Sequence, residues 1–92
     1  MKAKYILLDD AFEKRFAKYK GKLTESERQR LKQRLAIFKE DVFDKRLKTH
    51  KLKGELSAYH AFSISHSDRV VFQIFPDGGV YFIEVGGHDI CY

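Results

Sequence analysis

The sequence contains one cysteine, one proline and no tryptophan, and it has no long hydrophobic run. Because the single cysteine, Cys91, cannot close an internal disulfide, a disulfide-stapled secreted module is excluded and a reducing cytoplasm fits best. No apolar run approaches the ~18 residues of a membrane-spanning helix, and the stretch Tyr5–Leu8 is too short for a signal-peptide core. Repeats, linkers and low-complexity tracts are also lacking, so residues 1–92 are expected to form one cytoplasmic domain.

Charge is abundant, and its excess is concentrated. The chain has 18 lysines and arginines against 13 aspartates and glutamates, a net charge of +5, while a hydrophobic content of 43% argues against disorder. The segment Lys45–Gly54 holds five of the cations and no acid, so the charges of the remaining chain balance. A concentrated positive segment attracts phosphate backbones or acidic partner segments, although a solvated basic loop is the alternative.

The N-terminal half has the pattern of one strand and two helices. Lys4–Leu8 is a short β-type run. The sequence D-A-F-E, which begins at Asp10, has the spacing of a helix-capping box, and Gly21 is placed to end that helix. The sequence T-E-S-E, which begins at Thr24, predicts a second capped helix. Its apolar stripe is formed by Leu31, Leu35, Phe38 and Val42.

The C-terminal half changes to a hydrophobic period of two. Phe62 and Ile64 alternate with serines, Val70–Ile74 predicts the next strand, and Val80–Val85 predicts the last. Pro76–Gly79 is a strong hairpin turn signal. The predicted order is βααβββ, an α+β fold in which a two-helix hairpin packs on one face of a small antiparallel sheet.

The other face of the predicted sheet is expected to remain partly open, with Ser63, Ser65 and Arg69 pointing toward it. Together with His50, His88 and Tyr92, the arginine suits work on an RNA phosphodiester. Metal-free RNA cleavage needs a base for the 2′-hydroxyl proton, an acid for the departing 5′-oxygen and a fixed cation beside the phosphorus. Histidine and arginine suit these roles. A zinc site lacks recognisable ligand spacing, so neither a metal nor another cofactor is expected.

Three short motifs follow one another in the C-terminal half. H-K-L-K-G begins at His50, D-R-V-V-F begins at Asp68 after Tyr59 has led into a strand, and G-G-H-D-I-C-Y ends at Tyr92. In this order they resemble the RelE/ParE superfamily of toxins from type II toxin–antitoxin systems, most closely its YafQ-like and RelE/StbE-type branch. The resemblance implies a RelE-like microbial ribonuclease fold, an mRNA-cleaving toxin that enters the ribosomal A site, and a cognate antitoxin as partner.

The resemblance also implies roles for individual residues. Arg69 matches the strand arginine that stabilises the transferring phosphate, and His88 matches the terminal histidine that acts as acid or base. Tyr92 matches the terminal aromatic that orients a nucleotide, and His50 matches the histidine before L-x-G. RNA contacts are expected from Lys45, Arg46, Lys48, Lys51, Lys53, Ser63 and Ser65.

The sequence departs from the family pattern on the strand after Tyr59. Many members carry lysine or histidine where Ser63 or Ser65 stands here, and serine is a poor base. The acid–base work then shifts to the two motif histidines, unless His60 or His66 compensates after a small register change. Without such a change, His60 and His66 are expected to be ordinary surface residues.

Three alternatives remain open at this stage. Arg69 could pair with Asp68 or Glu84 in an ion pair that only stabilises the sheet. The chain could be a ParE-like inhibitor of DNA gyrase that cuts no RNA. It could also be an inactive toxin homologue that only binds its antitoxin.

Overall fold

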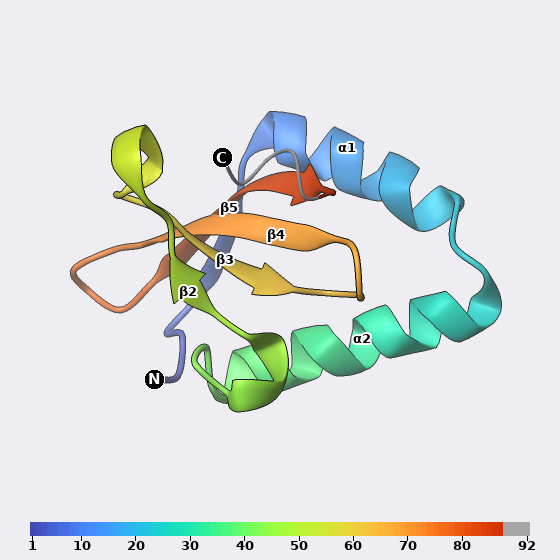
Figure 1. The fold of residues 1–92 in the computed structure, drawn as a ribbon, viewed down its shortest axis with the longest axis horizontal. Coiled ribbons are helices and arrows are strands. Elements are labelled where there is room, and N and C mark those ends of the chain that lie inside the picture. The colour runs from blue at the N-terminus through green and yellow to red at the C-terminus, as the bar shows by residue number, and fades with distance from the viewer. Residues whose placement is uncertain (88–92) are drawn as a thin grey trace.

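A computed structural model describes residues 1–87 of the chain as two helices and a five-stranded sheet (Figure 1). Within these residues, no helix has the length and apolar character needed to cross a membrane. The elements in chain order are β1 (Ile6–Leu8), α1 (Asp10–Gly21), α2 (Glu25–Glu40), the 3-10 helix η1 (Lys45–Leu47), β2 (His50–Lys51), the 3-10 helix η2 (Gly54–Leu56), β3 (His60–Ser63), β4 (Arg69–Ile74) and β5 (Val80–Gly86).

The predicted α+β class and the order of the main elements are confirmed, and the sheet differs in two details. Its strand order is β1-β5-β4-β3-β2, and β1 pairs with β5 in parallel, from Ile6 opposite Val80 to Leu8 opposite Phe82. The other pairs are antiparallel, so the sheet is mixed. The parallel pair arises because the helical hairpin carries the chain across the sheet before β5 forms beside β1. The second difference is the two-residue strand β2 (His50–Lys51), which lies within the basic segment Lys45–Gly54.

The helix starts are defined by side-chain caps. Thr24 and Glu27 form the predicted capping box at α2: the Glu27 amide donates to Thr24 Oγ1 at 3.2 Å, and the Thr24 amide donates to Glu27 Oε1 at 2.8 Å. The predicted cap of α1 is wrong by one residue. Asp9 is the N-cap, and its carboxylate accepts the amides of Ala11 and Phe12. Two consecutive aspartates made the position ambiguous in the sequence.

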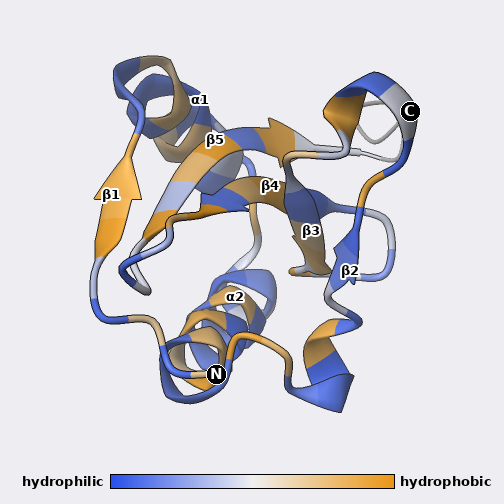
Figure 2. Ribbon diagram, turned by 90° about the vertical axis from the view of Figure 1, so that its left-hand side faces the viewer, coloured by the Kyte–Doolittle hydropathy of each residue, from blue (hydrophilic) through white to orange (hydrophobic). Residues whose placement is uncertain are grey.

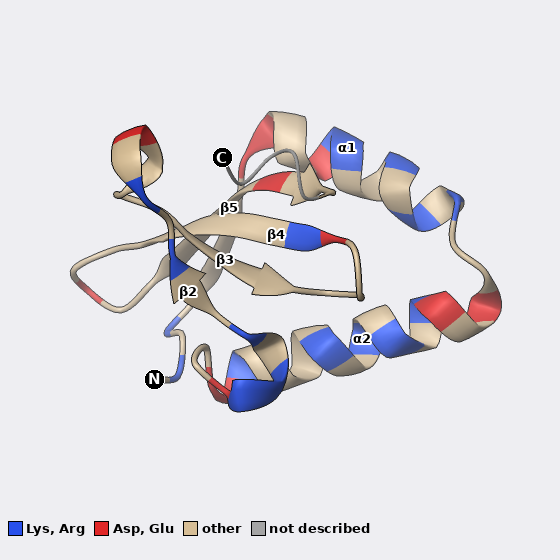
Figure 3. Cartoon of the chain, viewed as in Figure 1, with Lys and Arg blue, Asp and Glu red and all other residues tan. Residues whose placement is uncertain are grey.

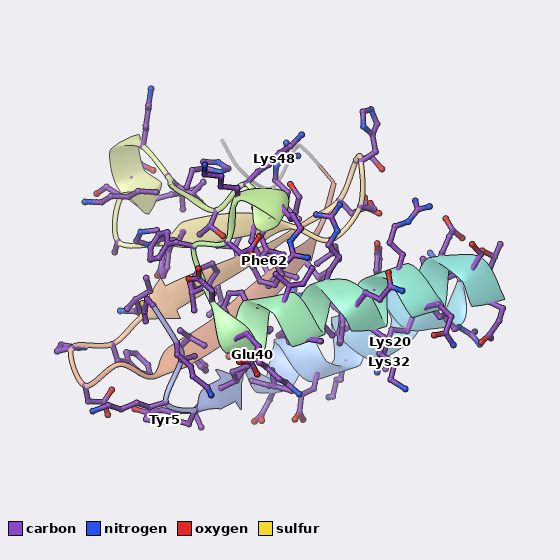
Figure 4. The ribbon with its side chains drawn as sticks, turned by 90° about the horizontal axis from the view of Figure 1, so that it is seen from below. Tyr5, Lys20, Lys32, Glu40, Lys48 and Phe62 are labelled. Carbon is purple, nitrogen blue, oxygen red and sulfur yellow. The ribbon has the colours of Figure 1, made fainter. Side chains whose placement is uncertain are left out.

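The core lies between the two helices and one face of the sheet. Phe62 of β3 stacks on Phe38 of α2 with ring centroids 4.4 Å apart. Figure 4 labels Phe62 beside α2. Phe72 and Phe82 meet the Phe38 ring edge-on, each at 5.2 Å, and Phe12 of α1 packs against Phe82. Figure 2 shows the apolar residues along β1, β4 and β5 and the hydrophilic ones in β2. One aromatic cluster therefore joins both helices to the sheet.

A smaller apolar cluster covers part of the opposite sheet face. It consists of Leu52, Ala61 and Val71, with Leu56 and Ile83 packed against it. The register of β4 and β5 shifts next to Val71, so that β5 contributes one extra residue there. The extra residue lets Phe82 and Val85, which are three residues apart, both face the main core, while Ile83 packs on the smaller cluster. The face that the sequence predicted to be partly open is thus covered around β2 and η2.

Candidate nucleic-acid interface

A groove of about 430 Å³ runs between α2 and the ends of β3 and β4. Four cationic side chains contribute to it, and none of its described lining residues is acidic. Figure 3 shows lysines and arginines along α2, in η1 and at the start of β4. The lining residues are Arg30, Arg34, Lys48, Ser63, Ser65, His66 and Arg69. Such a concentration of positive charge in a concave surface attracts phosphate groups.

The β3–β4 hairpin brings the polar residues of the groove together. Ser63 lies directly opposite Arg69 in the antiparallel register. The turn between them is closed by the Ile64 amide, which donates to the Asp68 carbonyl at 3.0 Å, and by the Asp68 amide, which donates to Ser65 Oγ at 3.1 Å. His66 lies within this turn and is exposed. The hairpin therefore places a guanidinium, two hydroxyls and an imidazole at one end of the sheet.

The opposite wall of the groove is formed where α2 meets η1. Asp44 caps η1 by accepting the Arg46 amide at 2.9 Å, and the following turn places Lys48 in a left-handed conformation with φ of 53°. Arg34 Nη1 donates to the carbonyl oxygen of Arg46, which joins α2 to η1. These contacts hold Arg34 and Lys48 on the same side of the groove.

Only part of the basic segment Lys45–Gly54 contributes to the groove. Arg46 lies outside the groove because its guanidinium forms a two-point pair with Asp44, at 3.0 and 2.9 Å. The hydrogen bonds from the Arg46 side chain and amide lower the pKa of Asp44 to about 2. Lys45, Lys51 and Lys53 are exposed and do not line the groove either. Lys48 is therefore the residue of the segment that contributes to the concave site.

His50 lies on the sheet face of Arg69 but outside the groove. It is opposite Ala61 in β3, whereas Arg69 is opposite Ser63, two residues further along that strand. In an ideal sheet this offset separates the two Cα atoms by about 12 Å. His50 Nδ1 lies 3.0 Å from the carbonyl oxygen of Lys48. Because a carbonyl can only accept, the neutral ring carries its hydrogen on Nδ1 and keeps Nε2 as a proton acceptor.

The structure brings together four of the predicted site residues, namely Lys48, Ser63, Ser65 and Arg69. Sequence reasoning missed Arg30 and Arg34 as groove residues. Their spacing of four residues places both on one side of α2, and this was the available signal. The predicted catalytic residues His88 and Tyr92 lie outside the described residues.

The two remaining histidines differ from one another. His66 is exposed as predicted and lines the groove. The expectation of a surface position for His60 is wrong: the residue is half-buried between Phe43 and Phe72, and its Nδ1 is buried without a hydrogen-bond partner. Burial, together with the nearby charge of Lys51, lowers the pKa of His60. The strand period explains its position, because His60 lies on the same face of β3 as the core residue Phe62.

The two carboxylates considered as partners of Arg69 have other contacts. Asp68 Oδ2 accepts the hydroxyl of Tyr19 at 2.8 Å, and Glu84 lies 3.0 Å from the Nε of Arg15. The first contact ties the β3–β4 turn to the C-terminal end of α1. No group of three or more metal-ligating side chains occurs in the part of the chain that the structure describes.

Tyr19 makes stability sensitive to alkaline pH. Burial, followed by the hydrogen bond to Asp68, raises the pKa of Tyr19 to about 12. The folded protein therefore retains a proton that the unfolded chain loses near pH 10, so stability is expected to fall as pH rises from about 10 to about 12. Urea unfolding at pH 9 and pH 11 is expected to show a steeper loss for the wild type than for Tyr19→Phe. Parallel losses in the two proteins would contradict this linkage.

No protein-family model and no curated protein sequence matches the chain. Among solved structures, YafQ from E. coli strain BL21(DE3) matches with a TM-score of 0.73 and 13% identity, covering 95% of this chain and 96% of YafQ. YafQ also matches in its complex with DinJ.

Two further solved toxins match over nearly the whole chain. The YoeB/ParE toxin from Agrobacterium tumefaciens has a TM-score of 0.69 and 16% identity, with 96% of this chain and 99% of the toxin covered. A copper-bound mutant toxin from Helicobacter pylori has a TM-score of 0.68 and 20% identity, with full coverage of both chains. The chain therefore has the fold of the RelE/ParE-like toxins that its sequence motifs indicated.

Proposed function

We propose that this chain is the toxin of a toxin–antitoxin system, a single-domain cytoplasmic endoribonuclease of RelE/YafQ type that cleaves mRNA on the ribosome. The observation that carries the proposal is the groove lined by four cationic residues and His66, the cations being Arg30, Arg34, Lys48 and Arg69. A strand of RNA presents one negative charge per phosphate, and the groove offers four cations and no acidic residue among its described lining. A guanidinium and an imidazole that line one groove suit phosphodiester cleavage, which needs charge stabilisation and proton transfer.

The proposed reaction uses the RNA's own 2′-hydroxyl as nucleophile. Its oxygen forms a bond to the adjacent phosphorus while the bond from phosphorus to the 5′-oxygen breaks, which gives a 2′,3′-cyclic phosphate and a 5′-hydroxyl end. One proton leaves the 2′-hydroxyl to a base, and another reaches the departing 5′-oxygen from an acid. Arg69 stabilises the charge that develops on the phosphate oxygens, and its planar fork suits two of them at once.

Two described histidines are candidates for the proton transfers. His66 shares the groove with Arg69, and His50 keeps its Nε2 available beside the groove. His88 and Tyr92 remain predictions from the sequence motif. The ribosome already holds the mRNA in a fixed position in the A site. It would therefore supply part of the alignment of the scissile phosphate that the reaction needs.

The proposed partner is an antitoxin protein. One of the solved structures that share this fold is the DinJ–YafQ toxin–antitoxin complex. With a net charge of +5, the chain favours an acidic partner segment, which would also oppose RNA binding by covering the cations of the groove.

The test is to add the purified chain to ribosomes programmed with a defined message and to map the new RNA ends. We expect cleavage within codons in the A site, with 5′-hydroxyl ends that polynucleotide kinase labels without prior phosphatase treatment. The same message without ribosomes is expected to remain largely intact. Addition of the protein encoded by the neighbouring gene is expected to stop the reaction.

Two other outcomes would overturn the nuclease. An intact message combined with inhibition of DNA supercoiling by gyrase would indicate the ParE-like alternative. An intact message and active gyrase, with tight binding to the product of the neighbouring gene, would indicate an inactive homologue.

A further inference from the structure

A second cavity opens beside the basic groove, between the turn joining α1 to α2 and the β3–β4 turn. Its volume is about 180 Å³. The aromatic ring of Tyr19 and the aliphatic side chains of Leu23, Leu31 and Ile64 line it. The carboxylates of Glu27 and Asp68 also line it, so it combines apolar walls with hydrogen-bond acceptors. Apolar walls with a few polar groups are typical of pockets that bind small ligands.

The cavity and the groove share three lining residues, Arg30, Ser65 and His66. A ligand that occupied both would therefore place an anionic part among the arginines and a less polar part against Tyr19. A nucleotide has this arrangement, since its base is attached through the sugar to the phosphate. Proteins that bind single-stranded nucleic acid combine a cationic groove with an aromatic side chain for the base in the same way.

We propose that this cavity binds one unstacked base of the RNA whose phosphate lies in the groove, and that it selects bases with an exocyclic amino group over uracil. The inference rests on the proposed function for its ligand, RNA, and adds a specificity pocket with Glu27 as the selecting residue.

The selection follows from the hydrogen-bond chemistry of the two carboxylates. An ionised carboxylate only accepts hydrogen bonds, so it favours the amino groups of adenine, cytosine or guanine and repels the carbonyl oxygen that uracil presents at the corresponding edge. Glu27 Oε1 accepts the Thr24 amide at 2.8 Å, which holds the carboxylate in place and leaves Oε2 for a ligand. Asp68 uses Oδ2 for the Tyr19 hydroxyl at 2.8 Å, and this contact orients the aromatic wall.

The test compares binding of dye-labelled single-stranded RNA tetranucleotides that differ at one position, A, C or U, by fluorescence anisotropy at constant salt. The wild-type chain is expected to bind the A and C forms about tenfold more tightly than the U form. In Glu27→Gln this ratio is expected to fall to about twofold or less, because the amide also offers a donor to uracil. Glutamine preserves the capping box, so the helix start is retained.

Glu25→Gln is the matched control. It makes the same change of charge two residues earlier in α2, where the carboxylate accepts from Gln29 and does not line the cavity. This variant is expected to keep the wild-type ratio. Equal affinities for all tetranucleotides in the wild type, or an unchanged ratio in Glu27→Gln, would overturn the inference.

The binding test is independent of the cleavage test. Base selection by a chain that cuts no message would support the pocket and refute the nuclease. Cleavage of message by a chain without base selection would support the nuclease and refute the pocket.

Discussion

Replacement of Arg69 with alanine is expected to lower the rate of mRNA cleavage by about 10²–10³-fold, the usual loss when one group that stabilises transition-state charge is removed. Arg69 begins β4, lines the groove and lies opposite Ser63. The negative charge on the phosphate oxygens grows as the 2′-oxygen attacks, so a fixed guanidinium contributes most in the transition state. The measurement is the single-turnover rate on ribosomes programmed with one message.

Arg69→Lys separates charge from geometry. The ammonium keeps the positive charge and loses the planar fork, so an intermediate rate is expected. Arg15→Ala is the matched control for Arg69→Ala, because it removes the same charge from α1, where Arg15 pairs with Glu84 at the surface. It is expected to cut at a rate close to that of the wild type. Equal losses in Arg15→Ala and Arg69→Ala would refute a specific role for Arg69.

Much of the fold could be predicted because its signals are local. The capping box at Thr24 and Glu27, the strand of β4 and the turn before β5 all depend on neighbouring residues. The Pro76–Gly79 turn is confirmed: the Phe75 amide donates to the Gly79 carbonyl at 2.8 Å, and Gly78 adopts a positive φ of 96°. The parallel pairing of β1 with β5 could not be predicted in this way, because it joins strands more than 70 residues apart and no local pattern encodes their relative direction.

Only part of the candidate site could be predicted, because some of its residues are brought together by local structure and others by tertiary packing. Arg69 and the two serines are brought together by one hairpin, and the period-two pattern was sufficient to place them on it. Arg30 and Arg34 reach the same groove from α2, which depends on how the helix packs against the sheet. The sequence analysis gave neither residue a role in the site, and only the tertiary structure shows that they line the groove with Arg69.

The basic segment illustrates how a charge count differs from a charged surface. Counting from Lys45 excluded Asp44, which stands immediately before the segment and neutralises Arg46 through two hydrogen bonds. The four lysines of the segment are all exposed, and Lys48, whose backbone is left-handed, is the one that lines the groove. The positive charge of the groove therefore depends on α2 as much as on the basic segment Lys45–Gly54.

Phe38→Ala is expected to lower the free energy of unfolding by about 3–5 kcal/mol, the largest stability change that a single core truncation brings. Phe38 is fully buried, and its ring contacts Phe62, Phe72 and Phe82 at centroid distances of 4.4 to 5.2 Å. Truncation removes the ring that joins α2 to three strands and leaves a cavity between them. A domain of this size is stable by only about 5–15 kcal/mol, so the variant would retain a small margin.

Phe43→Ala is the matched control for this prediction, because it deletes the same ring from a position that is 45% exposed and contacts His60 edge-on. Its cost is expected to be about 1 kcal/mol or less. Urea unfolding followed by circular dichroism measures both values.

Since α2 also carries Arg30 and Arg34, partial release of this helix in Phe38→Ala would move two cations away from Arg69. Cleavage by this variant is therefore expected to fall at temperatures below its unfolding midpoint, and undiminished cleavage there would show that the position of α2 is not required for the site.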